Sequence, residues 1–364
     1  MSATKLTPEI ASLIDPIVAK LKRRQIEGTN NIALDISHLL MRVISAARWT
    51  NPYDLIAVIR KVGTILTAAQ PKEIVIGNVV RRVLALIRDE IDTEPAGSNS
   101  GTTDTPMMSS MFSLLSTTQG SNKIEQNVQS KKQSSDFRSI IIQGIRDLID
   151  EISNVNEGLE TMSTDLIHDN EILLTPTPTS TTVLQFLVKA RAKRKFTVLV
   201  TENYPNDIKA ARKFVKTLAQ HKIESVLIPD TTTFAVMSRV GKVIIGSNAV
   251  FANGGCMTNS GVANVVECAK EHKTPVFAVA GLYKLSPLYP FNREDLMEVG
   301  NSGKVLNYDD FKLIDNVEVV TNPLHDYVPP EHIDIYLTNV GGFAPSFIYR
   351  IVLDNYKTED TNLE

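Results

Sequence analysis

The feature that most constrains the fold of this chain is a change in the spacing of its apolar residues near residue 170. Before this point, apolar residues recur every three to four positions, which is the spacing of amphipathic helices. After it, short continuous apolar runs alternate with segments of helical spacing, as in sheets whose parallel strands are buried on both faces. The chain has 364 residues, enough for about two domains. We therefore expect a helical region followed by an α/β domain.

Four helices are predicted in an N-terminal helical domain that covers residues 1–91. The apolar positions that define the first two are Ile10, Leu13, Ile14, Ile17, Val18 and Leu21, and then Ile36, Leu39, Leu40, Val43 and Ile44. Proline is favoured at the first helical position, because the backbone N–H that it lacks would have no hydrogen-bond partner within the helix there. Thr7-Pro8, Asn51-Pro52 and Gln70-Pro71 are therefore interpreted as helix starts, and the fourth helix should end near Asp92.

Residues 92–135 have a different character, because 16 of these 44 residues are Ser or Thr. A structureless stretch of this length is typical of a disordered insertion. The apolar segment 107–115 within it is either a short docking segment or an isolated apolar stretch in a loop. Helical spacing resumes from Phe137 to Leu166, which predicts one long connecting helix, assigned to residues 136–169.

The second half, residues 170–357, is predicted to be a Rossmann-like α/β domain with a mainly parallel sheet, followed by a C-terminal tail, residues 358–364. The expected strands are the apolar runs 172–174, 196–200, 226–228, 243–245, 276–280 and 335–337. Segments 182–193, 207–221 and 264–272 have helical spacing and lie between strands. Ligands of such sheets bind at the carboxyl ends of the strands, so the loops there are candidate sites.

Charge and cysteine content exclude several classes of protein. Lys and Arg number 38 against 41 Asp and Glu, so the net charge of −3 argues against nucleic acid as the main partner. The first ten residues lack a signal pattern, and no apolar run approaches the ~20 residues of a membrane span. Cys256 and Cys268 lie near no ligand cluster, so neither a disulfide framework nor a zinc site is expected. A cytoplasmic protein without metal or cofactor is predicted.

The standard phosphate-loop, dinucleotide, hydrolase and zinc-protease motifs are absent. A glycine-rich loop over 246–261 precedes a helix, where its amides could hold a phosphate; its glycines could equally serve tight packing. The hydroxyls of 175–181 could serve an anion, although Ser180 or Thr181 as a helix cap explains much of that segment.

Two further sets of residues have a structural and a functional interpretation. Lys189, Arg191, Lys193, Arg194 and Lys195 end a predicted helix, where they either offset the helix dipole or meet an acidic partner. The six histidines are scattered without metal-ligand spacing, so each is taken as structural by default.

A series of motifs in the second half resembles a known family. In order, they are residues 240–246 (VGKVIIG), 252–255 (ANGG), 275–280 (PVFAVA), 283–287 (YKLSP), 326–331 (DYVPPE) and 338–350 (TNVGGFAPSFIYR). Together they resemble the regulatory subunits of eukaryotic translation initiation factor 2B, and fungal forms of the beta type above all. The resemblance extends over essentially the whole chain, with 92–135 as the variable insertion.

The family is similar in fold to the methylthioribose-1-phosphate and ribose-1,5-bisphosphate isomerases, which use a Cys and an Asp. At the positions of these two groups the chain has Thr177 and Asn248, while the isomerase Asn-Lys pair becomes Thr258-Asn259. Isomerisation needs groups that can give and take a proton near neutral pH, and neither a threonine hydroxyl nor an asparagine amide can do so. The resemblance thus implies a vestigial pocket without catalysis, formed by Thr175, Thr177, Asn248, Asn253, Gly254, Gly255 and Asp326.

The resemblance implies a non-catalytic regulatory subunit of the guanine-nucleotide exchange factor for initiation factor 2. The expected partners are the alpha, gamma, delta and epsilon subunits in a decamer, and initiation factor 2 itself. The N-terminal helices would help receive that factor's alpha subunit, whose phosphorylation state the complex senses. No nucleic acid and no membrane are expected as direct partners.

The expected contact with the delta subunit lies in the α/β half. Residues 341–356 carry little charge and several aromatic side chains, as interfaces do, although burial in the chain's own core would produce the same pattern. The expected interface residues are His168, Phe343, Phe347 and Tyr349. Two alternatives stay open, a sugar-phosphate isomerase with a rearranged site and a sensor that binds a sugar phosphate.

Overall fold

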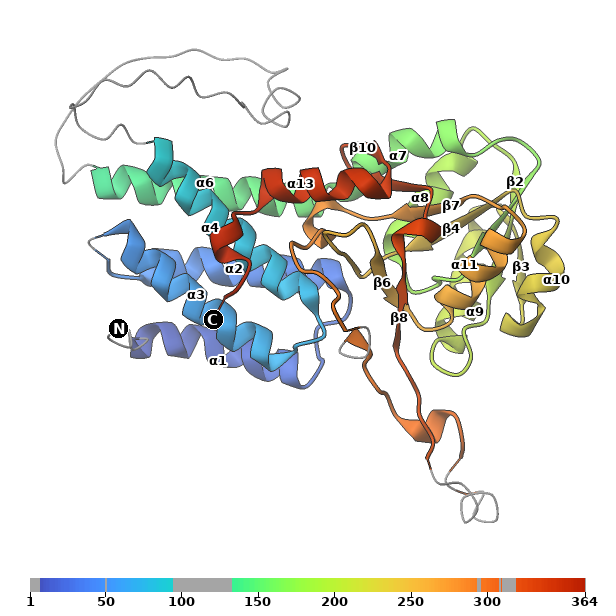
Figure 1. Cartoon of the computed structure of the whole chain (residues 1–364), viewed down its shortest axis with the longest axis horizontal. Coiled ribbons are helices and arrows are strands. Elements are labelled where there is room, and N and C mark those ends of the chain that lie inside the picture. The colour runs from blue at the N-terminus through green and yellow to red at the C-terminus, as the bar shows by residue number, and fades with distance from the viewer. Residues whose placement is uncertain are drawn as a thin grey trace. The chain divides into compact units, whose positions relative to one another are not determined.

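A computed structural model describes residues 7–49, 51–93, 133–292, 296–307, 309 and 319–363 of the chain (Figure 1). It divides into two compact units. The helical unit comprises Met1–Pro71, Ile76–Glu151 and Arg350–Glu364, and the α/β unit comprises Lys72–Val75 and Ile152–Tyr349. The predicted insertion 92–135, with its segment 107–115, lies outside the described residues except at its ends, where helices reach Thr93 and begin at Gln133.

The N-terminal region forms the four predicted helices. They are α1 (Pro8–Lys22), α2 (Thr29–Ala46), α3 (Pro52–Ala69) and α4 (Ile74–Thr93). The prediction that a helix starts at Gln70-Pro71 is wrong, because Gln70 is the C-cap of α3 and α4 begins at Ile74. At Gly63 of α3 a Cβ atom would lie 2.6 Å from Val80 of α4, so only glycine permits this close crossing.

The predicted single helix from Phe137 to Leu166 is instead two helices, α6 (Gln133–Ser153) and α7 (Val155–Leu166). They meet at Asn154, whose backbone (φ −99°, ψ 12°) leaves the helical region. Asparagine favours such positions because its short polar side chain competes for backbone hydrogen bonds. The apolar spacing continues through the break, so spacing alone did not reveal it.

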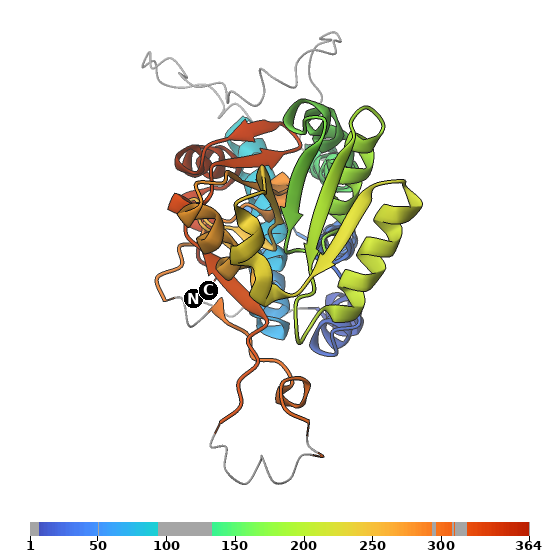
Figure 2. The same cartoon turned by 90° about the vertical axis from the view of Figure 1, so that its right-hand side faces the viewer.

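The α/β unit is built on a seven-stranded sheet in the order β10-β9-β7-β4-β1-β2-β3 (Figure 2). The bounds of these strands are β1 Glu171–Thr175, β2 Phe196–Thr201, β3 Glu224–Ile228, β4 Lys242–Gly246, β7 Val276–Val279, β9 Ile335–Thr338 and β10 Gly341–Phe343. The first six pair in parallel, and β10 pairs antiparallel with β9. All six predicted strands and the mainly parallel sheet are thus confirmed.

Helices connect the strands as right-handed crossovers require. The helices α8 (Thr181–Arg191) and α9 (Ile208–Gln220) lead toward one edge of the sheet. After β3 the chain returns to the middle through α10 (Thr233–Met237), and α11 (Val262–Glu271) leads toward the other edge. Helices on the two sides of this reversal therefore cover opposite faces of the sheet (Figure 2).

A second sheet, of three antiparallel strands, was not predicted. It comprises β5 (Ala249–Val250), β6 (Cys256–Asn259) and β8 (His325–Val328), in the order β5-β6-β8. Strand β5 is only two residues long, and β6 and β8 have four residues each and carry polar residues within them. Neither a continuous apolar run nor an alternating pattern therefore marks them in the sequence.

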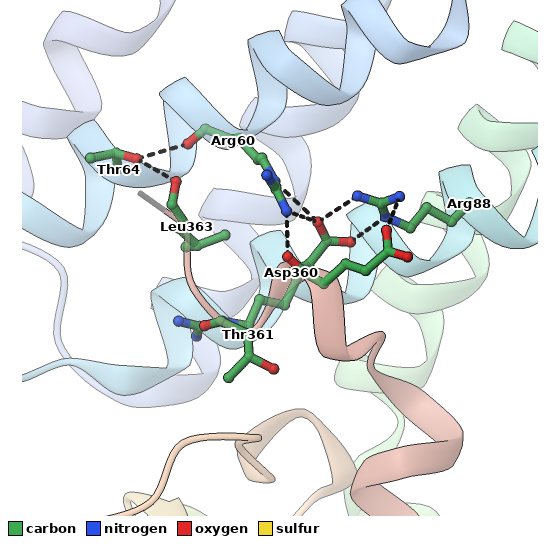
Figure 3. A network of polar contacts seen from close by, with 8 residues as sticks. Arg60, Thr64, Arg88, Asp360, Thr361 and Leu363 are labelled. Carbon is green, nitrogen blue, oxygen red and sulfur yellow. Dashed lines mark hydrogen bonds and ion pairs between the residues drawn. The ribbon is translucent and has the colours of Figure 1, made fainter.

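The C-terminal segment packs within the helical unit. It continues from α13 (Ile348–Asn355) into a short 3-10 helix, Thr358–Asp360, and Asp360 is 1% exposed. Its carboxylate accepts hydrogen bonds from Arg60 of α3 (2.8 and 3.1 Å) and from Arg88 of α4 (2.7 and 3.1 Å), as Figure 3 shows. The predicted tail at 358–364 is thus held by a buried ion pair, which explains why Arg350–Glu364 groups with the helices.

We expect Asp360→Asn to lower the free energy of unfolding of the helical unit by about 3 kcal/mol. Removing one member of a buried pair leaves the other charges without compensation. Calorimetric melting of the purified protein measures the loss.

The matched control is Glu359→Gln, which removes the neighbouring carboxylate. That carboxylate is also paired with Arg88 (2.6 Å), but its side chain is 69% exposed. An exposed pair contributes under about 1 kcal/mol. Equal losses for the two variants would contradict a special role of Asp360.

Candidate functional site

The order of the strands places the candidate site at the carboxyl ends of the central strands. Strand β1 pairs with β2 on one side and with β4 on the other, so the loops that follow β1 and β4 start next to each other. In α/β sheets, ligands bind where the strand order reverses in this way. The predicted site residue Thr175 ends β1, and Thr177 and Asn248 lie in the loops after β1 and β4.

The hydroxyl of Thr177 is engaged by the chain itself. Its Oγ1 accepts a hydrogen bond from the backbone N–H of Gly246 (2.9 Å) and lies 3.3 Å from Oγ1 of Thr175. Both threonines are buried. A Cβ atom on Gly246 would come within 2.6 Å of Ser180 Oγ, so glycine is required where the two loops meet. This hydroxyl links two loops and has no base beside it among the described contacts.

Asn248 belongs to a network of side chains from four segments. It donates to Asn259 Oδ1 (3.1 Å), and Asn259 donates in turn to Thr179 Oγ1 (2.7 Å) and Asp207 Oδ2 (3.2 Å). Burial raises the pKa of Asp207, while the hydrogen bond from Asn259 lowers it. The network therefore consists of amides and a hydroxyl around one carboxylate, a set suited to hydrogen bonding rather than to paired acid and base catalysis.

Asp326 caps the helix that follows the glycine-rich loop. Its carboxylate accepts from the backbone N–H groups of Gly261 (2.8 Å) and Ala263 (3.1 Å) at the start of α11. Gly261 has φ +91°, a left-handed conformation that favours glycine. Burial raises the pKa of Asp326, and the two N–H groups partly oppose this rise. The amides that could have held a phosphate here are taken by the chain's own carboxylate.

Asn253, Gly254 and Gly255 form the turn between β5 and β6, away from the Asn248 network by about 10 Å, the length of β6. Asn253 donates to the Tyr327 hydroxyl (2.8 Å), and the Tyr336 hydroxyl donates to Gly254 O (2.8 Å). A Cβ atom on Gly255 would lie 2.2 Å from the Tyr327 hydroxyl. These three residues therefore fit the turn against two tyrosines.

Sequence reasoning missed two charged residues that follow the carboxyl ends of strands, Asp207 after β2 and Lys284 after β7. Lys284 follows β7 and is 5% exposed, and its ammonium donates to Ser247 O in the loop after β4 (2.8 Å). Burial lowers the pKa of Lys284 to about 8, and nearby Glu73 opposes this shift. Both residues follow buried strands at their carboxyl ends, a position that could have identified them.

Metal and thiol chemistry find little support in the described part of the chain. It contains no group of three His, Cys, Asp or Glu side chains that could hold a metal ion. Burial raises the pKa of the Cys256 thiol to about 12, so this thiol is protonated and unreactive at neutral pH. Across the same residues, no helix has both the length and the apolar character needed to span a membrane.

The expected interface residues lie at two places in the α/β unit. Phe343 of β10 and Phe347 are partly exposed and stack on each other, with ring centroids 5.6 Å apart and an interplanar angle of 12°. Tyr349 is 49% exposed. His168, just before β1, is exposed, and its backbone N–H donates to Glu171 (3.0 Å).

Together, these features define a Rossmann-like α/β unit joined to a helical unit, in which hydroxyl and amide groups occupy the catalytic positions expected from the isomerases. A family model described as the initiation factor 2 subunit family matches residues 25–345. The chain belongs to this family.

Individual relatives agree with this assignment. The chain is 38% identical to translation initiation factor eIF2B subunit beta of Schizosaccharomyces pombe, over 98% of both chains. The chain is similar in structure to the crystal structure of eIF2B beta from Chaetomium thermophilum, with a TM-score of 0.71 and 28% identity over 99% of this chain and 95% of that one. It is also similar to a chain in the crystal structure of the tetrameric eIF2B-beta2-delta2 complex from the same organism, with a TM-score of 0.69 and 28% identity over 95% of each chain. Ribose 1,5-bisphosphate isomerase of Archaeoglobus fulgidus is 26% identical over 63% of this chain and 70% of its own.

We predict that Asp326→Ala lowers the free energy of unfolding by about 1–2 kcal/mol, the usual contribution of a helix cap. Asp326→Asn is the control and should lose less than half of this amount, because its amide oxygen can still accept from the same two N–H groups. Equal losses would show that capping is not its role.

A pH series should also separate the wild type from Asp326→Asn. A folded-state pKa above the unfolded value of about 4 means that folding favours the protonated acid. The wild type should therefore gain stability relative to the variant as pH falls from about 6 toward 4. Thermal melts across this window measure the difference. A loss of wild-type stability relative to the variant as pH falls would contradict the raised pKa.

Proposed function

We propose that this chain is a non-catalytic regulatory subunit, of the beta type, of the guanine-nucleotide exchange factor for initiation factor 2. The observation that carries the proposal is the state of the two catalytic positions. A threonine hydroxyl and an asparagine amide cannot serve as acid or base near neutral pH, and Thr177 and Asn248 are each hydrogen-bonded within the chain. The whole-length identity to the eIF2B beta subunit of S. pombe supports it.

In this role the chain acts through binding. Its partners are the alpha, gamma, delta and epsilon subunits of the factor, with two copies of each in a cytosolic decamer. It also helps recognise the alpha subunit of initiation factor 2 and transmits that subunit's phosphorylation state. A solved beta2-delta2 complex of a relative that covers 95% of this chain supports the pairing with delta.

The pairing with delta is assigned to the edge of the sheet that carries β10, with His168 as a further contact. The stacked rings of Phe343 and Phe347 and the half-exposed ring of Tyr349 offer the aromatic, weakly charged surface that interface centres favour. Because Tyr349 is exposed in the single chain, its removal should affect partner binding more than folding.

We expect a tagged chain, purified from the cells that naturally produce it, to bring down the other four subunits in equal amounts. Native mass spectrometry of the intact particle measures the composition. A particle that contains this chain alone would overturn the proposed function.

Tyr349→Ser should reduce the recovery of the delta subunit in this experiment by about tenfold, as the loss of an aromatic anchor does. Tyr53→Ser is the matched control, because Tyr53 is a tyrosine of similar exposure, 60%, on α3. Equal recovery of delta with both variants would place the delta contact elsewhere.

We also expect the purified wild-type chain to leave ribose 1,5-bisphosphate unchanged, because no acid and base pair is present at the two isomerase positions. Phosphorus NMR follows the reaction, with an archaeal ribose 1,5-bisphosphate isomerase as positive control. Turnover that depends on Asp207, lost in Asp207→Asn, would favour the isomerase alternative with a rearranged site.

A further inference from the structure

The basic run noted in the sequence is part of a larger concentration of positive charge. Residues 189–222 contain ten Lys or Arg and two Asp or Glu, a net charge of +8 in a chain whose total is −3. Some of these cations interact within the chain itself. Arg194 forms an ion pair with Asp169 (3.3 Å), and Arg191 donates to Lys222 O (2.7 Å), which ties the two turns at this end of the unit together.

Helix α9 carries four further cations on one side. Lys209, Arg212, Lys213 and Lys216 follow the three- and four-residue spacing of a single helix face, and all four are exposed. The opposite face, with Ala211, Phe214 and Leu218, is buried. Among the described residues, none of the four cations has an ion-pair partner. These four charges therefore form no ion pair within the described part of the chain.

An apolar surface lies beside this helix. Strand β3 is the last strand of the sheet and pairs only with β2, so its outer edge has no strand partner among the described strands (Figure 2). Val226 and Leu227 of β3 are 45% and 37% exposed. Tyr204 (59% exposed) is held at the end of β3 because its N–H donates to Asp230 (2.8 Å), and Phe234 (55% exposed) follows on α10.

The combination of the two surfaces indicates the class of partner. Surfaces that bind a nucleic-acid backbone are dominated by cations, whereas protein interfaces have an apolar centre within a polar rim. An exposed, unpaired strand edge also invites pairing with another protein chain. Here α9 packs against β3, so its exposed basic face and the apolar strand edge lie at the same end of the sheet (Figure 2). This combination favours a protein partner with acidic groups around an apolar patch.

We propose that β3 and the basic face of α9 form a second docking surface, for an acidic face of another subunit of the exchange factor. The β3 edge is at the opposite end of the sheet from β10, so one chain can hold delta at one edge and a different subunit at the other. This inference rests on the proposed function, since it takes the partner from the same complex.

The test compares two variants that each remove one Arg and two Lys. Arg212→Gln, Lys213→Gln and Lys216→Gln together neutralise the α9 face, and Lys20→Gln, Lys22→Gln and Arg23→Gln neutralise exposed cations at the end of α1. Each tagged chain is purified from its natural cells at about 0.1 M and about 0.4 M salt, since screening weakens exposed charge contacts. Mass spectrometry quantifies every subunit that co-purifies.

We expect the α9 variant to lose one subunit of the exchange factor about tenfold and to keep delta, while the α1 variant keeps all four other subunits of the exchange factor as the wild type does. The wild type should lose the same subunit as salt rises. Val226→Thr with Leu227→Thr should reduce that subunit even at low salt, because it removes apolar contact and keeps strand-favouring residues.

Three results would overturn the inference. If the α9 and α1 variants recover all subunits equally, the basic face is a solvated surface. If nuclease treatment of the wild type removes the same subunit, RNA rather than a direct protein contact joins them. If the wild type recovers no other subunit at all, the proposed function fails as well, which distinguishes that outcome from the first.

Discussion

The position of β1 between β2 and β4 is the constraint on which the site depends. Because the chain leaves β1 in one direction and later returns to its other side, the loops after β1 and β4 start together and diverge. The hydrogen bond from Gly246 N to Thr177 Oγ1 joins them at that point (2.9 Å). A hydroxyl suffices for this link, so the fold persists with threonine at a position where a catalytic thiol would be expected.

The architecture could be predicted from the sequence where burial requires a continuous run of apolar residues. Strands such as β4 and β7 are buried along most or all of their length, so they appear as unbroken apolar runs. The sheet of β5, β6 and β8 has no such pattern, because its strands are short and bear residues such as Thr258 and Asp326. Its stability comes from pairing between segments far apart in the sequence, which no local pattern records.

The site was predictable in part for the same reason. Thr177 and Asn248 could be placed because each follows a recognisable strand, and the family resemblance identified them. Asp207 could not be connected to Asn248, since their link runs through Asn259 on a strand that was not predicted. Asp360 was assigned to a tail because its partners, Arg60 and Arg88, lie some 300 and 270 residues away.

Polar side chains at the carboxyl ends of the strands are largely bonded to one another, which avoids the cost of leaving them without partners, although the hydroxyl of Ser247 is buried without one among the described residues. Here Asn248, Asn259 and Thr179 bond to one another, and Asp326 bonds to the start of α11. These bonds engage the polar groups at the carboxyl ends of the central strands within the chain. Binding of a partner protein then requires side chains that are exposed and not engaged within the fold. The cations of α9 and the exposed side chains of β3 are of this kind. In the proposed regulatory role, binding would therefore use the outer edges of the sheet, while the residues at the isomerase positions link its central loops.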